Sequence, residues 1–316
     1  MPSMKFLFRY SRGGLYLIWI IPWLFWLSVI HQQNPQQNQE EVMFAGGLRN
    51  HRWKDEEKGY LDIPTIYVIT PTYKRAHQKA ELTRLAQTLL HIRKLHWIIV
   101  EDSKWKTQLV SRFLMISGLS YMHLHISTPR KFRRKKNLWQ TPRGTEQRNL
   151  GIQWLRKNLQ ADDRGVVYFA DDDNTYDIRL FDEMRDTNGV SCWPAGLHGK
   201  ILYGGPICRD GKVIDFRAHW RRDRPFPMDM CSFAVNVKLL LESPEAKFDI
   251  EAEGGFQESS LLTKITTVDK LEPRAANCTK ILVWHTRTES PSLKDEEKLQ
   301  EELKLKYNNT LKIPEV

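Results

Sequence analysis

Cysteine is scarce in this sequence. The 316 residues include four cysteines, at positions Cys192, Cys208, Cys231 and Cys278. No two of them have the close spacing of zinc ligands, and four in so long a chain do not make the dense disulfide framework of a small secreted protein. The spacings leave open whether any two are bonded. A hydrophobic content of 41% is instead typical of a protein with a substantial packed core.

Acidic residues are in deficit as well. Lys and Arg number 48 against 38 Asp and Glu, a formal net charge of +10. This balance favours anionic partners such as nucleotides, anionic sugars, membrane head groups or nucleic acid. The densest basic run, Arg130–Lys136, contains a single aromatic residue, Phe132. Because a nucleic-acid site would have more interleaved aromatics and further basic segments, we expect no nucleic-acid partner.

Charged side chains are absent from Gly13–Ile30. A run of roughly 18 mostly apolar residues is about the shortest that spans a membrane. Lys5, Arg9 and Arg12 precede it and should stay cytoplasmic, and no small-residue cleavage site follows it. The sequence therefore predicts a cytoplasmic tail (1–12), a signal anchor (13–30), a flexible luminal stem (31–60) and a folded body (61–316) that faces the secretory lumen.

Strand and helix patterns alternate from residue 61 to about residue 185, which predicts a mostly parallel sheet covered on both faces. Polar residues follow three of the expected strands: TPTY at 70–73, Glu101-Asp102, and Asp171-Asp172-Asp173. Ligands of such sheets bind at the carboxyl ends of the strands, so we expect these groups to line one crevice. The expected strands are Thr65–Thr70, Trp97–Val100, Tyr121–Ile126 and Val166–Ala170, and the expected helices are 82–89, 107–116 and 146–159.

The acidic triplet supports two interpretations. Hard carboxylate oxygens at a strand end suit Mg²⁺ or Mn²⁺. The alternative is a solvated acidic turn, with Asp177 as the N-cap of a helix over Ile178–Met184. The triplet alone favours neither.

Residues 186–316 have shorter expected strands separated by Gly and Pro, which predicts a smaller mixed sheet and a surface for a second substrate. Short strands are expected at Val190–Trp193, Lys200–Tyr203, Val213–Phe216 and Lys280–Trp284.

Several further side chains suit a polar ligand, although each has a plainer explanation. Arg143 and Arg148 flank an expected helix start, a favourable place for phosphate or carboxylate, but either could simply be solvated. Glu258 could act as a general base or stabilise the first turn of a helix. His285 and Arg287 could pair with a diphosphate or face water at a strand end.

Two segments match the N-glycosylation pattern, at Asn277 and Asn308.

Seven segments resemble the β-1,3-glucuronosyltransferases (glycosyltransferase family 43), in particular the enzymes of the proteoglycan linkage region. They are ITPTYKR, HWIIVEDS, TPRGTEQRN, GVVYFADDDNTYD, RPFPMDM, GGFQESSLL and EPRAANCTKILVWHTRTE, which together extend over Leu61–Glu289. The resemblance implies a GT-A fold, a single-pass type II Golgi anchor, a homodimer and Mn²⁺-dependent inverting transfer from UDP-glucuronic acid.

The resemblance also implies residue roles. Glu258 matches the catalytic base, Asp173 the Mn²⁺ ligand, and Arg224 and Asp229 the contacts to a galactose-terminated glycan acceptor. The matching donor-binding residues are Pro71, Thr72, Tyr73, Asp102, Arg143, Arg148, Asp171, Asp172, His285 and Arg287.

Two positions depart from the family pattern. Gly204 stands where the family usually has an acceptor-contacting glutamate, and Asp295 where the linkage-region enzyme has a glutamine. Galβ1-3Gal of the linkage region is the favoured acceptor. The alternatives are Galβ1-4GlcNAc termini, or a poorly active paralogue that binds UDP-sugar or glycan.

Overall fold

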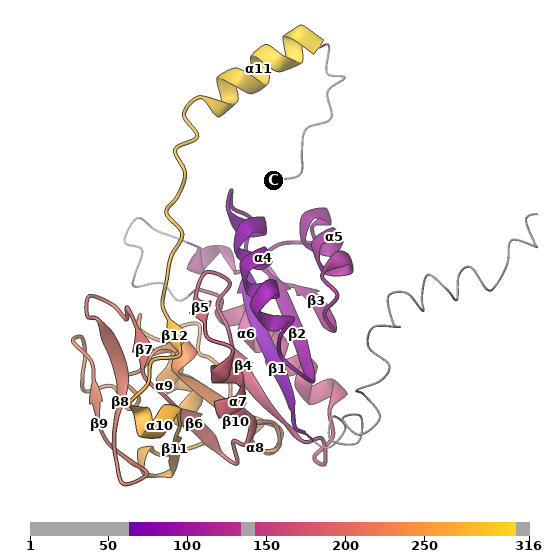
Figure 1. Ribbon diagram of the computed structural model, residues 1–316. Helices are drawn as coiled ribbons and strands as arrows, with labels where there is room; N and C mark the ends of the chain where they lie inside the picture. The colour runs from indigo at the N-terminus through magenta and orange to yellow at the C-terminus, as the bar shows by residue number, and fades with distance from the viewer. Residues whose placement is uncertain (1–62, 134–142, 308–316) are drawn as a thin grey trace, which may run out of the picture. The chain divides into compact units, whose positions relative to one another are not determined.

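The computed structural model describes residues 63–133 and 143–307 (Figure 1). The strands are β1 Thr65–Thr72, β2 Leu95–Glu101, β3 Tyr121–His125, β4 Gly165–Phe169, β5 Thr175–Tyr176, β6 Val190–Cys192, β7 Ala195–Gly196, β8 Tyr203–Arg209, β9 Lys212–Arg217, β10 Phe233–Asn236, β11 Leu271–Pro273 and β12 Val283–Trp284. The α-helices are α4 Gln78–Leu89, α5 Gln108–Ile116, α6 Thr145–Asn158, α7 Arg179–Arg185, α8 Val237–Glu242, α9 Gln257–Leu262, α10 Ala275–Cys278 and α11 Glu296–Tyr307.

The central sheet has seven strands in the order β11-β6-β10-β4-β1-β2-β3. Only β10 runs antiparallel to its neighbours, and the other paired strands are parallel. A five-stranded mixed sheet has the order β5-β12-β7-β8-β9. The predicted GT-A class, an α/β fold with a mostly parallel central sheet and a smaller mixed sheet, is confirmed.

Strands that follow one another in the sequence do not all belong to the same sheet. Strand β5, which follows the acidic triplet, joins the smaller sheet through β12, while β6, β10 and β11 extend the central sheet beyond β4. The candidate site therefore lies on a framework that both parts of the sequence build.

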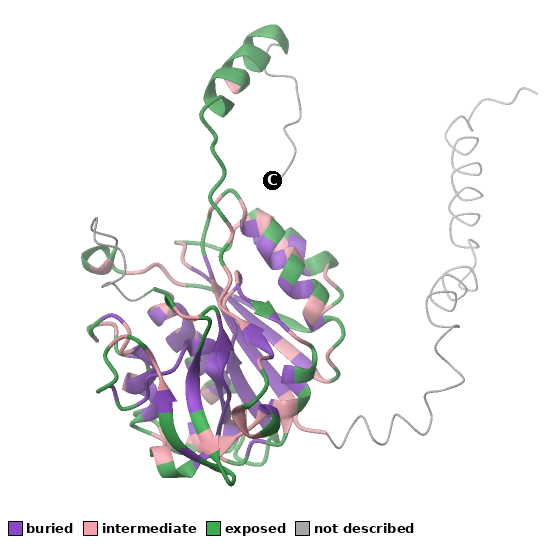
Figure 2. Ribbon diagram, turned by 60° about the vertical axis from the view of Figure 1, so that its left-hand side comes forward, coloured by how far each residue is buried: buried purple, intermediate pink, exposed green. Residues whose placement is uncertain are grey.

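Both faces of the central sheet are packed, because successive strand residues point to opposite sides. On one side, Ile66 and Val68 of β1 pack with residues of α4, α5 and α7. On the other, Tyr67 and Ile69 pack with residues of α6, α8 and α9. Figure 2 shows the resulting buried interior along the strands.

Strand β1 does not stop before Pro71, as the sequence predicted, but continues to Thr72. Its pairing with β4 ends at Ile69, whereas its pairing with β2 runs to Thr72. Pro71 thus lies beyond the last pair between β1 and β4, where β1 pairs only with β2. Proline has no amide hydrogen, but no bond to β4 is lost at this position. The expected strand Lys200–Tyr203 is also wrong: residues before Tyr203 form turns, and β8 begins at Tyr203.

Cys208 of β8 is bonded to Cys278, while Cys192 and Cys231 are buried thiols. The bond ties the smaller sheet to a turn in which Ala275, Ala276, Asn277 and Cys278 all have positive φ, between 52° and 62°. Such backbone is costly for residues other than glycine, so this turn depends on the contacts around it.

The predicted membrane location needs correction. No helix within residues 63–133 and 143–307 is long and apolar enough to cross a membrane. The expected anchor, residues 13–30, lies outside the described residues, as does Asn308. The expectation of a type II protein of the Golgi membrane with a luminal body is therefore withdrawn.

Candidate active site

The three predicted polar strand ends meet. Asp172 is buried and accepts a hydrogen bond from the Thr72 hydroxyl at 2.6 Å, which joins the end of β1 to the end of β4. Its other carboxylate oxygen lies 2.6 Å from the Arg75 guanidinium, which also pairs with Glu81 of α4. Burial raises the pKa of Asp172, although Arg75 and Thr72 oppose this effect. With both oxygens engaged, Asp172 is part of the framework of the site.

Asp171 is held from the side of α6. Arg148 donates to the Asp171 carboxylate at 2.5 Å and to the Arg143 carbonyl at 2.8 Å, and the Tyr176 hydroxyl donates to the Asp171 carbonyl at 2.8 Å. Arg148 reaches this position across Gly144, which has φ +69°, and a Cβ there would lie 2.9 Å from the guanidinium. Only glycine fits this approach without strain.

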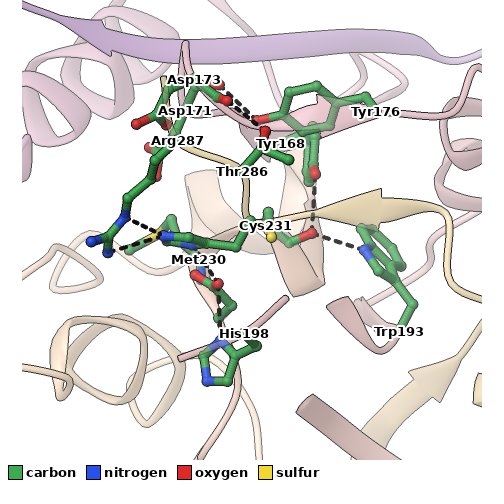
Figure 3. Close-up of polar contacts among 12 residues, drawn as sticks. Tyr168, Asp171, Asp173, Tyr176, Trp193, His198, Met230, Cys231, Thr286 and Arg287 are labelled. Atoms are coloured by element: carbon green, nitrogen blue, oxygen red, sulfur yellow. Dashed lines mark hydrogen bonds and ion pairs between the residues drawn. The ribbon is translucent and has the colours of Figure 1, made fainter. Parts of the chain in front are cut away.

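Asp173 is anchored through its backbone. Its carbonyl accepts hydrogen bonds from Arg84 and from the Thr286 hydroxyl, both at 2.7 Å (Figure 3). Neither of these bonds involves the Asp173 carboxylate. Burial, followed by repulsion from Asp171 and Asp172, raises the pKa of Asp173 to about 6. No cluster of three or more His, Cys, Asp or Glu that could hold a metal occurs among the described residues. Any cation here would have to take most of its ligands from the substrate and water.

Asp229 precedes a short 3₁₀ turn, Met230–Ser232, and is buried between two histidines. Its Oδ2 accepts from His285 Nδ1 at 2.8 Å and from His198 Nδ1 at 3.0 Å, and its Oδ1 accepts from the Met230 amide at 2.7 Å. Burial alone would raise the Asp229 pKa, but the two imidazoles hold it well below its usual range. Asp229 is therefore an anion that orients both rings.

The series of contacts continues from Asp229 through His285 to Arg287. Arg287 lies near Asp171 and Asp173 (Figure 3). The hydrogen bond to Asp229 raises the pKa of His285 to about 9. Arg287 nitrogens lie 3.3 and 3.4 Å from His285 Nε2, a contact that suits the neutral ring. The two contacts favour different protonation states. The Asp229 contact dominates because it is shorter and Asp229 is buried.

Glu258 is in the first turn of α9 and is 8% exposed. Its Oε2 is buried and has no hydrogen-bond partner among the side chains and backbone that the structure describes. Burial and the nearby negative charge of Asp229 raise the Glu258 pKa to about 7. A carboxyl group with this pKa can take up a proton near neutral pH, as a general base must.

The remaining predicted residues have mixed placements. Tyr73 is 45% exposed beyond β1, with the Arg75 guanidinium 4.5 Å from its ring centroid. Asp102 accepts from the Thr128 amide and hydroxyl at 2.8 and 2.7 Å, and the N-cap of the following helix α5 is Thr107. Asp177 accepts from the Arg179 amide at 2.9 Å, but the N-cap of α7 is Ile178, one residue later than expected.

Arg224 uses its donors on backbone. It contacts the carbonyls of Gly255, Arg221 and Trp220 at 2.6, 3.1 and 3.4 Å, which fixes the loop before Glu258. Asn277 lies in the left-handed turn, away from the carboxylates, and its Oδ1 is buried.

Sequence reasoning missed His198, Arg75, Arg84 and Thr286. Arg75 lies in the quoted ITPTYKR segment, so its proximity to a strand end could have suggested a role. His198 lies in a loop without periodic pattern, and nothing local in the sequence connects it to Asp229.

Comparison with known proteins bears on this arrangement. The sequence profile of glycosyltransferase family 43 matches residues 85–289. The chain belongs to glycosyltransferase family 43. Among its relatives is galactosylgalactosylxylosylprotein 3-beta-glucuronosyltransferase 3 of Homo sapiens, 52% identical over 250 residues, which cover 75% of each chain.

Two further family members are similarly close. Galactosylgalactosylxylosylprotein 3-beta-glucuronosyltransferase 2 of Rattus norvegicus is 53% identical over 239 residues, 75% of this chain and 72% of the relative. Galactosylgalactosylxylosylprotein 3-beta-glucuronosyltransferase 1 of Homo sapiens is 51% identical over 242 residues, with the same two coverages. The predicted family resemblance is confirmed.

Proposed function

We propose that this family 43 protein is an inverting glucuronosyltransferase. It moves glucuronic acid from UDP-α-glucuronate to the 3-hydroxyl of a terminal β-galactose, with Galβ1-3Gal of the proteoglycan linkage region as the favoured acceptor. The observation that carries the proposal is the Glu258 carboxyl group, buried, with Oε2 unpartnered and a pKa of about 7. The names of the relatives supply the sugar and the acceptor class.

The acidic triplet and its neighbours form the donor side. Tyr73, Thr72, Pro71 and Asp102 hold the uridine, and an exposed aromatic ring such as Tyr73 suits base stacking. Arg143, Arg148 and Asp171 complete the donor contacts, and Asp172 supports them indirectly by holding Thr72 and Arg75. His285 and Arg287 face the diphosphate, where their positive charge stabilises the leaving group.

The Asp173 carboxylate fits Mn²⁺. It is a hard oxygen ligand, and the hydrogen bonds at Asp173 go to the backbone carbonyl and not to the carboxylate. Burial and the neighbouring negative charges raise the Asp173 pKa to about 6, and a cation would relieve the crowding of charge. A divalent ion held by one carboxylate and substrate phosphates is a familiar arrangement. When bound, the ion would neutralise charge that develops on the departing diphosphate.

Glu258 takes the proton from the galactose 3-hydroxyl. The oxygen forms a bond to the anomeric carbon of glucuronate, on the face opposite UDP, as the bond from that carbon to the phosphate oxygen breaks. The electron pair leaves with UDP, and the α-linked donor becomes a β-glucuronide. Arg224 holds the loop that carries Glu258, and Asp229 is placed on the acceptor side.

The experiment is a transfer assay of the full-length protein with UDP-glucuronic acid, with and without Mn²⁺. Galβ1-3Gal and Galβ1-4GlcNAc are offered separately. The proposal expects Mn²⁺-dependent product on Galβ1-3Gal. Product on Galβ1-4GlcNAc alone would identify the glycoprotein-terminus alternative. Intact UDP binding without product on either would identify a poorly active glycan-binding paralogue.

Gly204 is the observation that favours the alternatives, because it provides no acceptor-side carboxylate. The homodimer and the absence of a nucleic-acid partner stay predictions. The molar mass in solution tests the first, and a filter-binding assay with RNA and DNA tests the second.

A further inference from the structure

His198 follows a strained turn between β7 and β8. Leu197 has φ 54°, a conformation uncommon for a side chain other than glycine, and is 48% exposed. The turn is closed by the Leu197 amide, which donates to the Leu202 carbonyl at 2.7 Å. Strain of this kind clusters at functional sites, where it fixes the position of a particular group. Here the next residue along the chain is His198.

The His198 ring is fixed by a buried anion. Its Nδ1 donates to Asp229 Oδ2 at 3.0 Å, the same oxygen that accepts from His285. A carboxylate without a proton can only accept, so this contact requires hydrogen on Nδ1. Nε2 lies on the opposite side of the ring, and the side chain is 17% exposed. One nitrogen therefore sets the orientation while the other stays available.

Gly204 makes room for this orientation. A Cβ at position 204 would lie 2.6 Å from His198 Cδ2 and 3.1 Å from the Arg217 carbonyl. Real Cβ atoms do not approach ring carbons so closely, so any side chain at 204 would displace the imidazole. Gly204 and His198 are thus coupled, because the His198 ring occupies the space that a side chain at position 204 would need.

His198 lies on the side of the site that carries the base. Figure 3 shows it at the opposite end of the series of polar contacts from Asp171, Asp173 and Arg287. The segment His219-Trp220 links the two loops involved, since His219 packs against Gly199 and Trp220 against Gly255. The Gly255 loop leads into the helix of Glu258.

We infer that His198 is a specificity-determining residue that binds the acceptor, its Nε2 forming a hydrogen bond with a sugar hydroxyl beside the one that reacts. This inference rests on the proposed function. It gives the acceptor side a neutral polar contact in the space that Gly204 leaves, and so accounts for a site without a carboxylate at that position. The ligand it fits is an uncharged galactoside.

The test separates acceptor binding from the structural support of Asp229. In His198→Asn, the amide nitrogen can occupy the place of Nδ1 and still donate to Asp229, but no atom replaces Nε2. His198→Ala loses both contacts, and Gly204→Ala displaces the ring. Two variants are the matched controls. His91→Asn changes an exposed histidine in the turn after α4, and in Gly189→Ala the new Cβ would meet only the flexible Glu272 side chain, at 3.3 Å.

Galβ1-3Gal is titrated by calorimetry into each full-length variant saturated with UDP and Mn²⁺, and UDP is titrated separately. Loss of one hydrogen bond should raise the acceptor Kd about five- to tenfold in all three site variants. The UDP Kd should stay within about twofold, as in the controls.

Two results would overturn the inference. One is an acceptor Kd in His198→Asn equal to that of the wild type, because the ring would then act only through Asp229. The other is a wild-type protein that binds no galactoside. A wild type that binds galactoside but transfers no glucuronate would refute the proposed function alone, and the ratio of Kd values would still decide the role of His198.

Discussion

On the donor side, the carboxylates follow a strand that is buried on both faces, and ion pairs from α6 and from the end of β1 hold two of them. On the proposed acceptor side, His198 comes from a turn of the smaller sheet, Asp229 from the loop before β10, and Glu258 from a six-residue helix. The first set is positioned by regular structure. The second depends on a buried anion shared by two rings and on the left-handed backbone of Leu197.

This difference indicates how the effect of a substitution should spread on each side of the site. At a sheet edge, many backbone hydrogen bonds fix the positions of the side chains. Substitution of one residue there should therefore leave the neighbouring side chains in place. Residues held by one another shift together, as Gly204 and His198 illustrate. We therefore expect donor variants to show separable effects and acceptor variants to show coupled ones.

The largest effect is expected on the acceptor side, from Glu258→Gln. The amide cannot accept the hydroxyl proton, so turnover should fall by about 10²- to 10⁴-fold, the usual contribution of a general base. Calorimetry should find UDP binding unchanged. Glu251→Gln is the matched control, because that glutamate is exposed in an ion pair with Lys131. Loss of UDP binding in Glu258→Gln would argue that the residue belongs to the donor side.

Next comes a contrast between adjacent donor-side aspartates. Asp172→Asn removes one partner of a buried pair with Arg75 and should lower the free energy of unfolding by about 3 kcal/mol. Asp173→Asn should leave the unfolding midpoint near that of the wild type but abolish the enhancement of UDP binding by Mn²⁺. Chemical denaturation and calorimetry with and without EDTA measure the two effects. If the two variants behaved alike, the division of roles within the triplet would be wrong.

The smallest effect is expected from pH, which acts on both sides. Glu258 must be deprotonated to accept a proton, so kcat/KM should rise as pH increases through about 7. His285 is charged below its raised pKa, so kcat/KM should fall again through about 9. His285→Gln should lose the upper limb and keep the lower one. A profile that is flat from about pH 6 to about pH 8, one pH unit on each side of the Glu258 pKa, would contradict the base assignment.

The donor side was largely predictable from sequence. Val166–Ala170 is a continuous apolar run that ends in charges, a pattern that specifies a buried strand and an exposed edge together, and β4 was found there. The helix expected over 107–116 was found as α5, whose first turn is capped by the Thr107 hydroxyl, an interaction that acts within a few residues.

The acceptor side was less predictable for a physical reason. Strand β10 is four residues long and β12 is two, too short for a period to be detected. The contact between His198 and Asp229 joins positions 31 residues apart, and the bond between Cys208 and Cys278 joins positions 70 apart. Neither leaves a local signal, and the resemblance to known family members placed Asp229 without revealing its second histidine.

The order of the strands also has a consequence for synthesis of the protein. One edge of β4 pairs with β1, and the other pairs with β10, which is synthesised later, at residues 233–236. The Asp173 carbonyl acquires its partner Thr286 later still. A ribosome therefore completes the carboxylates more than a hundred codons before the His285–Arg287 segment that faces them. On the proposed assignment, a prematurely terminated chain can contain the whole acidic triplet and still lack His285 and Arg287, the residues that would face the diphosphate, so transfer becomes possible only after β12 has been synthesised.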